Sequence, residues 1–484
     1  MRTSRSAQVD IVLDRTAPEP LYQQIYQRLR DAIVAGALRE GDLLPTTRSV
    51  ASGLEVARCT VERAYSQLAV EGYVDAVARS GHRVRRLQTA FLQSAAAPRE
   101  APHVKLPARR VAFFEEFEHG PDVPYDFAFA RLAPGSFPVK TWLRLEQEVL
   151  HYADDDLLGN YPLEHRPSAL QRELARYLRR TRGVVCAPEQ VVVLPSTDVA
   201  LTTLLGLFDP GRHRVGCEEP GYTGCVEVAR RLGFSVDPLP VDRGDAAFLD
   251  ALRTAGSGVA FVTPSHQFPT GAVMPLSTRA ELLSWANAND VFLIEDDSCN
   301  EYRYDTDPVP SLSSLDAQGR VCYLGNFSKT LCPGLRVAYA VVPERLLERY
   351  FDRFWSASTA VSLITQEVLA RFIATGAMDQ QVRKMVAAGR QRHDRLLSCL
   401  RQGFGDRIAL QGTNAGLHFC VGLPNGMSED ELVSSARAQG AQVYRSSIYR
   451  CSGRPYPPQV IVGFSAIDPD EVAPGVQALV RAWG

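Results

Sequence analysis

The stretch Gly325-Asn326-Phe327-Ser328-Lys329-Thr330, followed by Pro333-Gly334-Leu335-Arg336, carries the most information in this sequence. It comes directly after the apolar run 321–324, a pattern typical of a buried strand. A lysine at the end of such a strand, partly desolvated and near another cation, is a candidate amine for forming an imine. Taken alone, Lys329 fits a surface loop better, so its role depends on the rest of the chain.

The composition is that of a globular protein. A length of 484 residues predicts two or three domains, and 45% hydrophobic and 22% charged residues are ordinary values. The net charge of −2 excludes a uniformly basic nucleic-acid coat. The ten cysteines are scattered, without the spacing of a metal site, and suit a reducing cytoplasm. With neither a signal-peptide pattern nor a run of about 18 apolar residues, we expect a cytoplasmic protein without a membrane span.

Residues 19–87 predict a small winged helix-turn-helix domain of the α+β kind. Leu21, Ile25, Leu29 and Ile33 repeat at helical spacing, and Gly36 follows. Two further helices are predicted, a short one capped by Thr46 or Thr47 and one from Cys59 to about Glu71. Segments 72–77 and 82–84 then read as a two-stranded hairpin.

The rest of the chain divides into a linker and two lobes. Residues 88–110 are rich in small residues and proline, which indicates a flexible linker. From 111 to 379, apolar strands alternate with helical patterns, as in an α/β domain with a mainly parallel sheet. The strands are predicted at Val191–Leu194, Arg214–Cys217, Val259–Thr263, Val291–Ile294, Val321–Leu324 and Val337–Val342. Residues 380–484 indicate a smaller α+β lobe.

The second helix of the helix-turn-helix is expected to enter the DNA major groove with its first residues on base edges. Arg58 is placed to reach guanine, the commonest specific contact. The other predicted DNA-binding residues are Arg48 and Arg63 on phosphates, Thr60 and Tyr65 on phosphates or bases, and Gly81 and His82 at the tip of the wing. A helical bundle that binds protein, with solvated arginines, is the alternative.

This segment resembles the GntR-type winged-helix domain. The resemblance is carried by Pro20-Leu21-Tyr22-Gln23-Gln24-Ile25, by the stretch from Gly36 to Arg48, and by the stretch from Thr60 to Leu68. It implies that the domain binds double-stranded DNA as a dimer on two half-sites.

A second set of residues has the chemistry of a pyridoxal 5′-phosphate (PLP) site. PLP needs an aldehyde-bonding lysine and a carboxylate at its ring nitrogen, and Asp296 lies at the end of a predicted strand. Ser196 and Thr197 begin a helix, whose N-terminus favours phosphate. Tyr222 is on a loop, able to lie against a flat ring, and Arg336 can neutralise a phosphate. A solvated or capping role is the alternative for carboxylates at a strand end.

These pieces look like the fold-type I aminotransferase domain, and the whole chain resembles the MocR-type, GabR-like regulators of the GntR family. The motifs are Ser265-His266-Gln267-Phe268-Pro269-Thr270-Gly271, Ile294-Glu295-Asp296-Asp297 and the stretch from Phe327 to Arg336. The resemblance implies a homodimer, packed head to tail, in which an aminotransferase-like domain senses PLP, alone or with an amine, and controls transcription.

The resemblance also assigns roles. Lys329 forms the Schiff base with PLP, Asp296 pairs with the pyridine nitrogen, and Tyr222 stacks on the ring. The predicted phosphate contacts are Ser196, Thr197, Ser328 and Arg336, with Tyr161 matching the tyrosine that reaches the neighbouring subunit's phosphate.

Several positions depart from the family pattern. Ser298 stands where the family has a tyrosine that bonds the cofactor's phenolic oxygen, and Ser196-Thr197-Asp198 replaces Gly-Ala-Gln at the phosphate turn. Arg166 replaces a glycine, Gly224 replaces an arginine of GabR-like members, and Ile461 aligns with the arginine that binds a substrate carboxylate. Arg445, Arg450 and Arg454 can substitute for that arginine, although a solvated role suits each of them better.

We therefore expect a transcriptional regulator that binds PLP on Lys329 and senses an amine or amino-acid-like effector, rather than an enzyme that turns substrate over. Two alternatives remain open from the sequence. One is an active PLP-dependent aminotransferase with an autoregulatory DNA-binding domain. The other is a regulator whose degenerate large domain no longer binds PLP.

Overall fold

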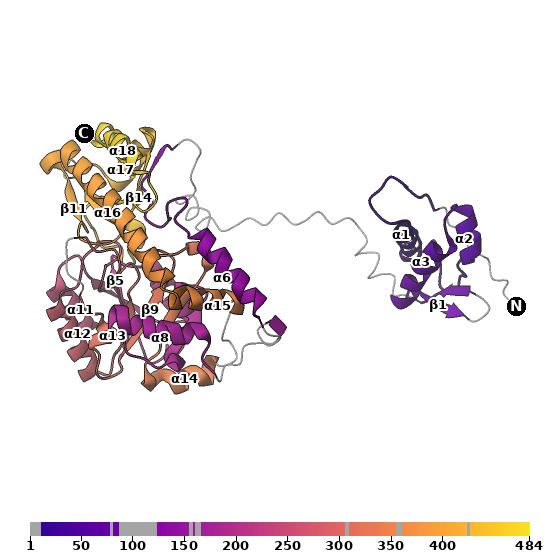
Figure 1. Cartoon of the computed structure of the whole chain (residues 1–484), viewed down its shortest axis with the longest axis horizontal. Coiled ribbons are helices and arrows are strands. Elements are labelled where there is room, and N and C mark those ends of the chain that lie inside the picture. The colour runs from indigo at the N-terminus through magenta and orange to yellow at the C-terminus, as the bar shows by residue number, and fades with distance from the viewer. Residues whose placement is uncertain are drawn as a thin grey trace. The chain divides into compact units, whose positions relative to one another are not determined.

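The protein is described from a computed structural model that covers residues 11–77, 81–86, 123–153, 158–159, 166–304, 309–354, 361–423 and 426–484. The chain forms two compact units, Met1–Val111 and Ala112–Gly484, coloured indigo and magenta to yellow in Figure 1. Residues 88–110, predicted to be a linker, lie outside the described residues. No described helix is long and apolar enough to cross a membrane.

The first unit is the predicted winged helix-turn-helix. Its elements are α1 (Leu21–Val34), α2 (Thr47–Gly53), α3 (Arg58–Val70) and the antiparallel hairpin β1 (Val74–Val77) with β2 (Gly81–Val84). Ile25, Leu29 and Val61 are fully buried, because their helical spacing puts them on the inner faces of α1 and α3. Thr46 caps α2 by accepting the Ser49 N–H at 3.1 Å.

The segment before residue 19 belongs to the same core. Ile11 and Leu13 pack against the cluster formed by α1 and α3. Asp14 and Gln24 exchange hydrogen bonds, since the Asp14 N–H donates to the Gln24 side chain at 2.9 Å and Gln24 donates back to the Asp14 carbonyl at 2.8 Å. The winged-helix unit therefore begins at or before residue 11.

The second unit is built on a seven-stranded sheet in the order β4-β10-β9-β8-β7-β5-β6. The strands are β4 (Val191–Leu194), β5 (Val215–Glu219), β6 (Val236–Pro240), β7 (Val259–Val262), β8 (Phe292–Asp296), β9 (Val321–Asn326) and β10 (Ala338–Val341). Only β10 runs against its neighbours β4 and β9. The mainly parallel α/β sheet predicted from the sequence is confirmed.

Helices cover both faces of this sheet. Alternate strand residues point to opposite faces, so Val192 joins one core cluster and Val191 and Val193 join another. The first face packs against α9 (Thr197–Leu205), α10 (Thr223–Arg231) and α14 (Glu344–Phe354). The second packs against α6 (Val139–His151), α8 (Ala169–Arg182), α11 (Asp245–Ala255), α12 (Leu276–Ala288) and α15 (Leu363–Ala374).

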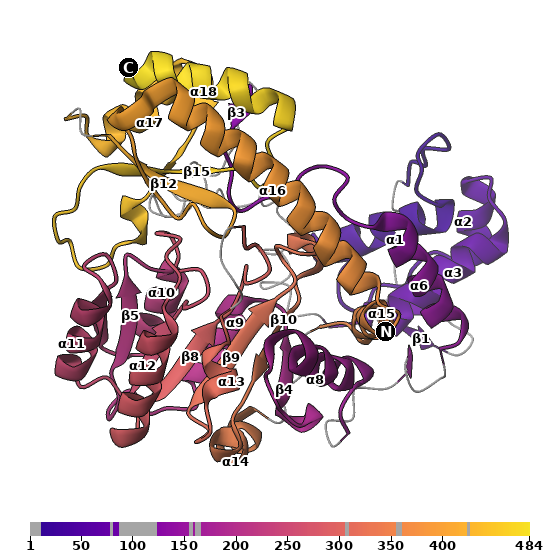
Figure 2. The same ribbon diagram turned by 60° about the vertical axis from the view of Figure 1, so that its left-hand side comes forward.

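The C-terminal part is a smaller α+β lobe. Its sheet has the order β11-β12-β15-β14, from β11 (Ala409–Gln411), β12 (His418–Gly422), β14 (Tyr444–Arg445) and β15 (Gln459–Gly463). α16 (Ala377–Phe404), α17 (Glu429–Ala438) and α18 (Pro469–Trp483) complete it, while β3 (Tyr125–Asp126) pairs with β13 (Ala441–Gln442). Figure 2 shows α16 running from beside α18 to α15, so one helix joins the lobe to the large sheet.

Candidate functional site

The sheet topology brings the predicted cofactor residues to one edge. Leu194 at the end of β4 lies opposite Ala338, Ala338 lies opposite Asn326, and Leu324 lies opposite Asp296. The loops after β4, β5, β8 and β9 therefore share this edge with the start of β10. Ser196, Tyr222, Ser328 and Lys329 lie on these loops, Thr197 begins α9, Asp296 ends β8, and Arg336 precedes β10. Ligands of open α/β sheets bind at this kind of edge.

Lys329 has no acidic partner among the residues that the structure describes. Its Nζ donates to the Ala130 carbonyl at 3.2 Å, and its own carbonyl accepts from the Tyr302 hydroxyl at 2.6 Å. Burial lowers the pKa of the Lys329 amine, although the nearby Cys299 thiol acts in the opposite sense. Among the described residues no carboxylate forms an ion pair with it. A desolvated amine of this kind is a better nucleophile than a solvated ammonium.

Asp296 faces the site because of strand alternation. Ile294 packs beneath α9 and α10, and Asp296, two residues later on β8, shares that face. Its carboxylate accepts the Ser298 N–H at 2.9 Å. Burial raises the pKa of Asp296, while the Ser298 hydrogen bonds offset part of that rise. No basic side chain within the described part of the chain pairs with Asp296.

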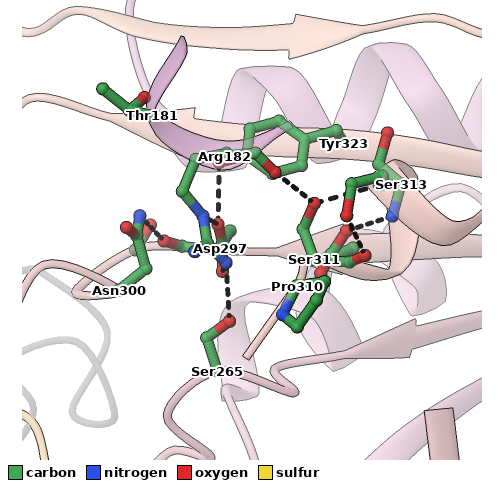
Figure 3. Close-up of polar contacts among 12 residues, drawn as sticks. Thr181, Arg182, Ser265, Asp297, Asn300, Pro310, Ser311, Ser313 and Tyr323 are labelled. Carbon is green, nitrogen blue, oxygen red and sulfur yellow. Dashed lines mark hydrogen bonds and ion pairs between the residues drawn. The ribbon is translucent and has the colours of Figure 1, made fainter. Parts of the chain in front are cut away.

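The carboxylates on either side of Asp296 have partners of their own, and Figure 3 shows the contacts around Asp297. Asp297 accepts Arg182 Nε at 2.6 Å and the Tyr323 hydroxyl at 2.8 Å, and Arg182 also donates to Ser265 at 3.2 Å. The side chains of Arg182 and Asp297 are 9% and 0% exposed. Although burial opposes the charge, the attraction of Asp297 raises the pKa of Arg182. This ion pair fixes the end of β8.

Glu295 is held in a similar way. Its two carboxylate oxygens accept the N–H groups of Leu312 and Ser313, each at 2.8 Å, at the start of α13 (Leu312–Leu315). Burial raises the pKa of Glu295 to about 8, and the charge of Asp297 adds to that rise. Glu295 and Asp297 therefore bind partners in the protein interior. Asp296 is the carboxylate of this run that lies on the site face.

Two of the predicted phosphate residues, Thr197 and Ser328, contact Asn326, which the sequence reasoning did not single out. Asn326 Nδ2 donates to Ser298 Oγ at 2.6 Å and lies 3.4 Å from Thr197 Oγ1, while its Oδ1 accepts the Ser328 N–H at 3.0 Å. Ser196 caps α9 by accepting the Val199 N–H at 3.2 Å. The position of Asn326 at the last residue of a strand, two before Ser328, was the available signal.

Tyr222 and Asp198 form a pair. The Tyr222 hydroxyl donates to Asp198 Oδ1 at 2.8 Å. Burial, together with Asp198, raises the pKa of Tyr222. At Gly224 an added Cβ would come within 2.4 Å of the Tyr222 ring. The position of the Tyr222 ring therefore requires a glycine at residue 224.

Arg336 is exposed and has a left-handed backbone, with φ of 54°. Within the described residues its guanidinium has no hydrogen-bond or ion-pair partner. Tyr161 lies outside the described residues. No group of three or more His, Cys, Asp or Glu within the described ranges is placed to hold a metal ion.

The structure separates the predicted DNA-binding residues into exposed and internal ones. Arg48 and Arg58 are exposed, and Arg58 pairs with Glu62 at 2.8 Å across one turn of α3. Arg63 is exposed but stacks over the Tyr22 ring at 4.0 Å. Thr60 is half-buried near the start of α3. The exposed set therefore lies on α2 and α3.

Tyr65 is buried, contrary to the predicted contact with DNA. It is 1% exposed, and its hydroxyl donates to the Pro45 carbonyl at 2.8 Å. Its ring also meets the half-buried His82 ring edge-on at 5.1 Å, while Gly81 is exposed with φ of 93°. Tyr65 therefore joins the helix-turn-helix to the wing from inside the core and does not face DNA.

Arg15 is a residue that the sequence reasoning missed. Its Nη2 donates to the carbonyls of Leu54 and Glu55, at 3.3 and 3.2 Å. These carbonyls end α2, and Glu55 has a left-handed backbone with φ of 52°. A cation at a helix C-terminus is stabilising, so Arg15 holds the turn that positions α3.

Comparisons with known proteins agree with this two-part architecture. The family described as bacterial regulatory proteins, gntR family, matches residues 21–84, and aminotransferase class I and II matches residues 131–479. The multiple substrate aminotransferase from Thermococcus profundus has a TM-score of 0.69 and 23% identity, covering 78% of this chain and 95% of that chain. An archaeal alanine:glyoxylate aminotransferase has a TM-score of 0.70 and 21% identity, covering 78% and 96%. These likenesses define the fold.

Similar proteins over nearly the full length define the family. The chain is 32% identical to the HTH-type transcriptional regulator YhdI of Bacillus subtilis, covering 97% of both chains. It is 32% identical to the probable rhizopine catabolism regulatory protein MocR of Rhizobium meliloti, covering 98% of this chain and 96% of that protein. The protein is thus a winged-helix regulator fused to an aminotransferase-like domain. It belongs to the MocR-type transcriptional regulators of the GntR family.

The buried ion pair yields a stability prediction. We expect Arg182→Ala to destabilise the second unit by about 3–5 kcal/mol, because it leaves the Asp297 carboxylate buried without its cation. Arg180 lies on the same helix as Arg182 and forms a more exposed ion pair with Asp379 of α16. Arg180→Ala should therefore cost less than about 1 kcal/mol of stability. Urea unfolding curves of the full-length variants measure both, and equal losses would contradict the role assigned to Arg182.

The contact of Arg15 with the α2–α3 turn yields a second prediction. Arg15→Ala should weaken binding to DNA that the wild-type protein selects from a random pool by roughly 1–3 kcal/mol, with the salt dependence unchanged. Arg28→Ala, which removes the same charge from an exposed position on α1, is the control. A salt slope reduced by about 1 in Arg15→Ala would instead indicate a direct phosphate contact.

Proposed function

We propose that this regulator binds PLP covalently through Lys329 and uses the cofactor-bearing pocket to sense a small amine effector that changes its action on DNA. The observation that carries the proposal is the meeting, at one sheet edge, of a half-buried amine and a half-buried carboxylate, Lys329 and Asp296, that both lack ion-pair partners among the described residues. Unpaired buried charges are costly, so they are retained where a ligand pairs with them.

The residues at this edge fit PLP. Lys329 would bond the aldehyde, Asp296 would face the ring nitrogen, and Tyr222 would lie against the ring. Ser196, Thr197, Ser328 and Arg336 would hold the phosphate, and Tyr161 is proposed to reach the phosphate of the second subunit. The N-terminus of α9 adds unpaired backbone N–H groups to that set.

Two further observations support the fit. The guanidinium of Arg336 has no partner in the described part of the chain, as expected of a side chain reserved for an anion. The hydroxyl of Thr330, next to Lys329, is buried without a hydrogen-bond partner among the described residues. When bound, PLP supplies an aldehyde that incoming amines can exchange onto and an electron-withdrawing ring.

Sensing explains the altered residues better than turnover does. Ser298 supplies no phenol, and its hydroxyl accepts the hydrogen bond of Asn326 instead. The chain also devotes a separate folded unit to a winged helix-turn-helix. We therefore propose that amine binding at the pocket is read out as a change in DNA binding.

We propose that the protein acts on operator DNA as a cytoplasmic homodimer, packed head to tail. Val139, Leu143 and Leu150 on α6 are 53%, 50% and 47% exposed, and spacings of four and seven residues put them on one face of the helix. An exposed apolar face of this kind suits burial against a second copy. A dimeric helix-turn-helix protein reads two half-sites.

The cofactor proposal predicts the effect of removing the lysine. Purified wild-type protein mixed with PLP should show a visible absorbance band that borohydride abolishes, leaving a pyridoxyl group on Lys329. Lys329→Ala should lose the band and the effect of amines on DNA binding, because no other described lysine lies at this sheet edge. Lys384→Ala, an exposed lysine on α16, should retain both. The same band in Lys329→Ala would refute the proposal.

The DNA-binding proposal predicts different effects for two exposed arginines. Arg58→Ala should relax base preference at one position by about 1–3 kcal/mol. Arg48→Ala should weaken binding uniformly and reduce the salt slope by about 1, since we propose that it contacts a phosphate. Binding titrations on selected and scrambled DNA at several salt concentrations measure both. Unchanged discrimination in Arg58→Ala would contradict its assignment to a base edge.

A further inference from the structure

A hollow lies between the ends of β5 and β6 and the loop that precedes β15. It encloses about 270 Å³, part of it open to solvent. Its charged lining comes from the end of β5, from the turn after β6 and from the loop 450–455, namely Glu219, Asp242, Arg243, Arg450 and Arg454. None of the described residues that are predicted to bind the cofactor lines this hollow.

The two acids of the hollow leave its positive charge in excess. Glu219 is engaged by the loop, because its carboxylate accepts the Ser452 N–H at 3.1 Å and the Ser452 hydroxyl at 2.6 Å. Asp242 is exposed. Three guanidinium groups and two carboxylates line the hollow, so one positive charge is not balanced by the lining itself.

Arg450 has a donor without a partner. Its guanidinium lies over the Tyr456 ring, with Cζ 3.3 Å from the ring centre, and this contact fixes the plane of the group. Its Nη2 is shielded from solvent and has no hydrogen-bond partner in the described structure. Burial raises the pKa of the Cys420 thiol to about 12, and the Arg450 charge acts against that rise. A donor left in this state costs free energy that an anionic acceptor would recover.

The other two arginines of the hollow are also available. Arg243 and Arg454 are exposed, and neither guanidinium forms a hydrogen bond or an ion pair with the residues that the structure describes. Arg445 differs, because its Nε pairs with Asp430 at 3.0 Å and it does not line the hollow. A guanidinium fork matches the two oxygens of a carboxylate.

The loop that carries Arg450 is attached to the segment after β5. The Gly221 N–H donates to the Tyr449 carbonyl at 2.9 Å, and the Ser452 hydroxyl donates to Glu219 at 2.6 Å. Arg450 lies between these two attachments. The hollow is therefore anchored to the segment that carries the predicted ring-stacking tyrosine.

From this arrangement we propose that the hollow binds the carboxylate group of a small organic acid, held by Arg450 with support from Arg243 and Arg454. The site is additional to the proposed PLP site and does not depend on it. One carboxylate balances the single excess positive charge, whereas a phosphate dianion would exceed it. Pro240 and Pro455 complete the lining and offer apolar surface to the body of the acid.

Isothermal titration calorimetry of the full-length protein tests the proposal with benzoate and benzamide, which match in shape and differ in charge. Chloride keeps the ionic strength constant. We expect benzamide to bind at least roughly 10-fold more weakly than benzoate, because it lacks the charge that a guanidinium pairs with. Equal binding of the two, or no binding of benzoate, would overturn the proposal. Tighter binding of phenyl phosphate than of benzoate would overturn the choice of a carboxylate.

Substitutions in the loop identify the residues that bind the anion. Arg450→Gln should weaken benzoate binding by roughly 10- to 100-fold, because it removes the charged fork. Arg454→Gln should weaken it by only roughly 2- to 5-fold, because that side chain is exposed. Arg445→Gln is the matched control from the same loop and should leave the affinity unchanged. Equal losses in Arg450→Gln and Arg445→Gln would contradict the role given to Arg450.

Arg336→Ala separates the hollow from the predicted phosphate position at the sheet edge. Benzoate binding should survive in Arg336→Ala, and the opposite pattern, loss there with retention in Arg450→Gln, would place the anion at the sheet edge and overturn the proposal. Circular dichroism checks that each variant folds. If Arg450→Gln does not fold, Arg450→Lys, which keeps the charge without the fork, replaces it. Undiminished benzoate binding in Arg450→Lys would refute the role of the guanidinium.

Discussion

The buried ion pair between Arg182 and Asp297 is the interaction on which the site depends. It joins the last turn of α8 to the end of β8, and through Ser265 it also holds the loop after β7. A charge pair with almost no solvent access tolerates little displacement, since either partner alone would be stranded in a medium of low polarity. Strand alternation then leaves Asp296 on the other face, where Lys329 is found. The candidate site is therefore positioned from behind the sheet.

Much of the fold could be predicted from periodicity. Ile25 and Leu29 are spaced four apart on α1, and both are buried as that spacing predicts. The apolar runs of the central strands are buried as well. β6 could not be recognised in this way, because Pro238 and Pro240 argue against a strand. The sheet order explains their presence: β6 is an edge strand, where one row of backbone donors has no partner to satisfy.

The site residues divide along a similar line. The positions of Lys329 and Asp296 could be predicted, because Asp296 ends one apolar strand pattern and Lys329 closely follows another. Tyr65 was misread, although its spacing from Val61 and Leu68 placed it on the apolar face of α3. Arg15 and Asn326 act through backbone carbonyls and short side-chain bonds between segments distant in sequence. Contacts of that kind leave no local pattern, so the sequence alone does not reveal them.

The departures from the family pattern are consistent with one another, which bears on whether the large domain has decayed. Asp198 is bound by the Tyr222 hydroxyl, and Gly224 leaves the space that the Tyr222 ring occupies. Ser298 accepts the amide of Asn326, which also bonds the backbone of Ser328. Asp198, Gly224 and Ser298 are each accommodated by a neighbouring residue.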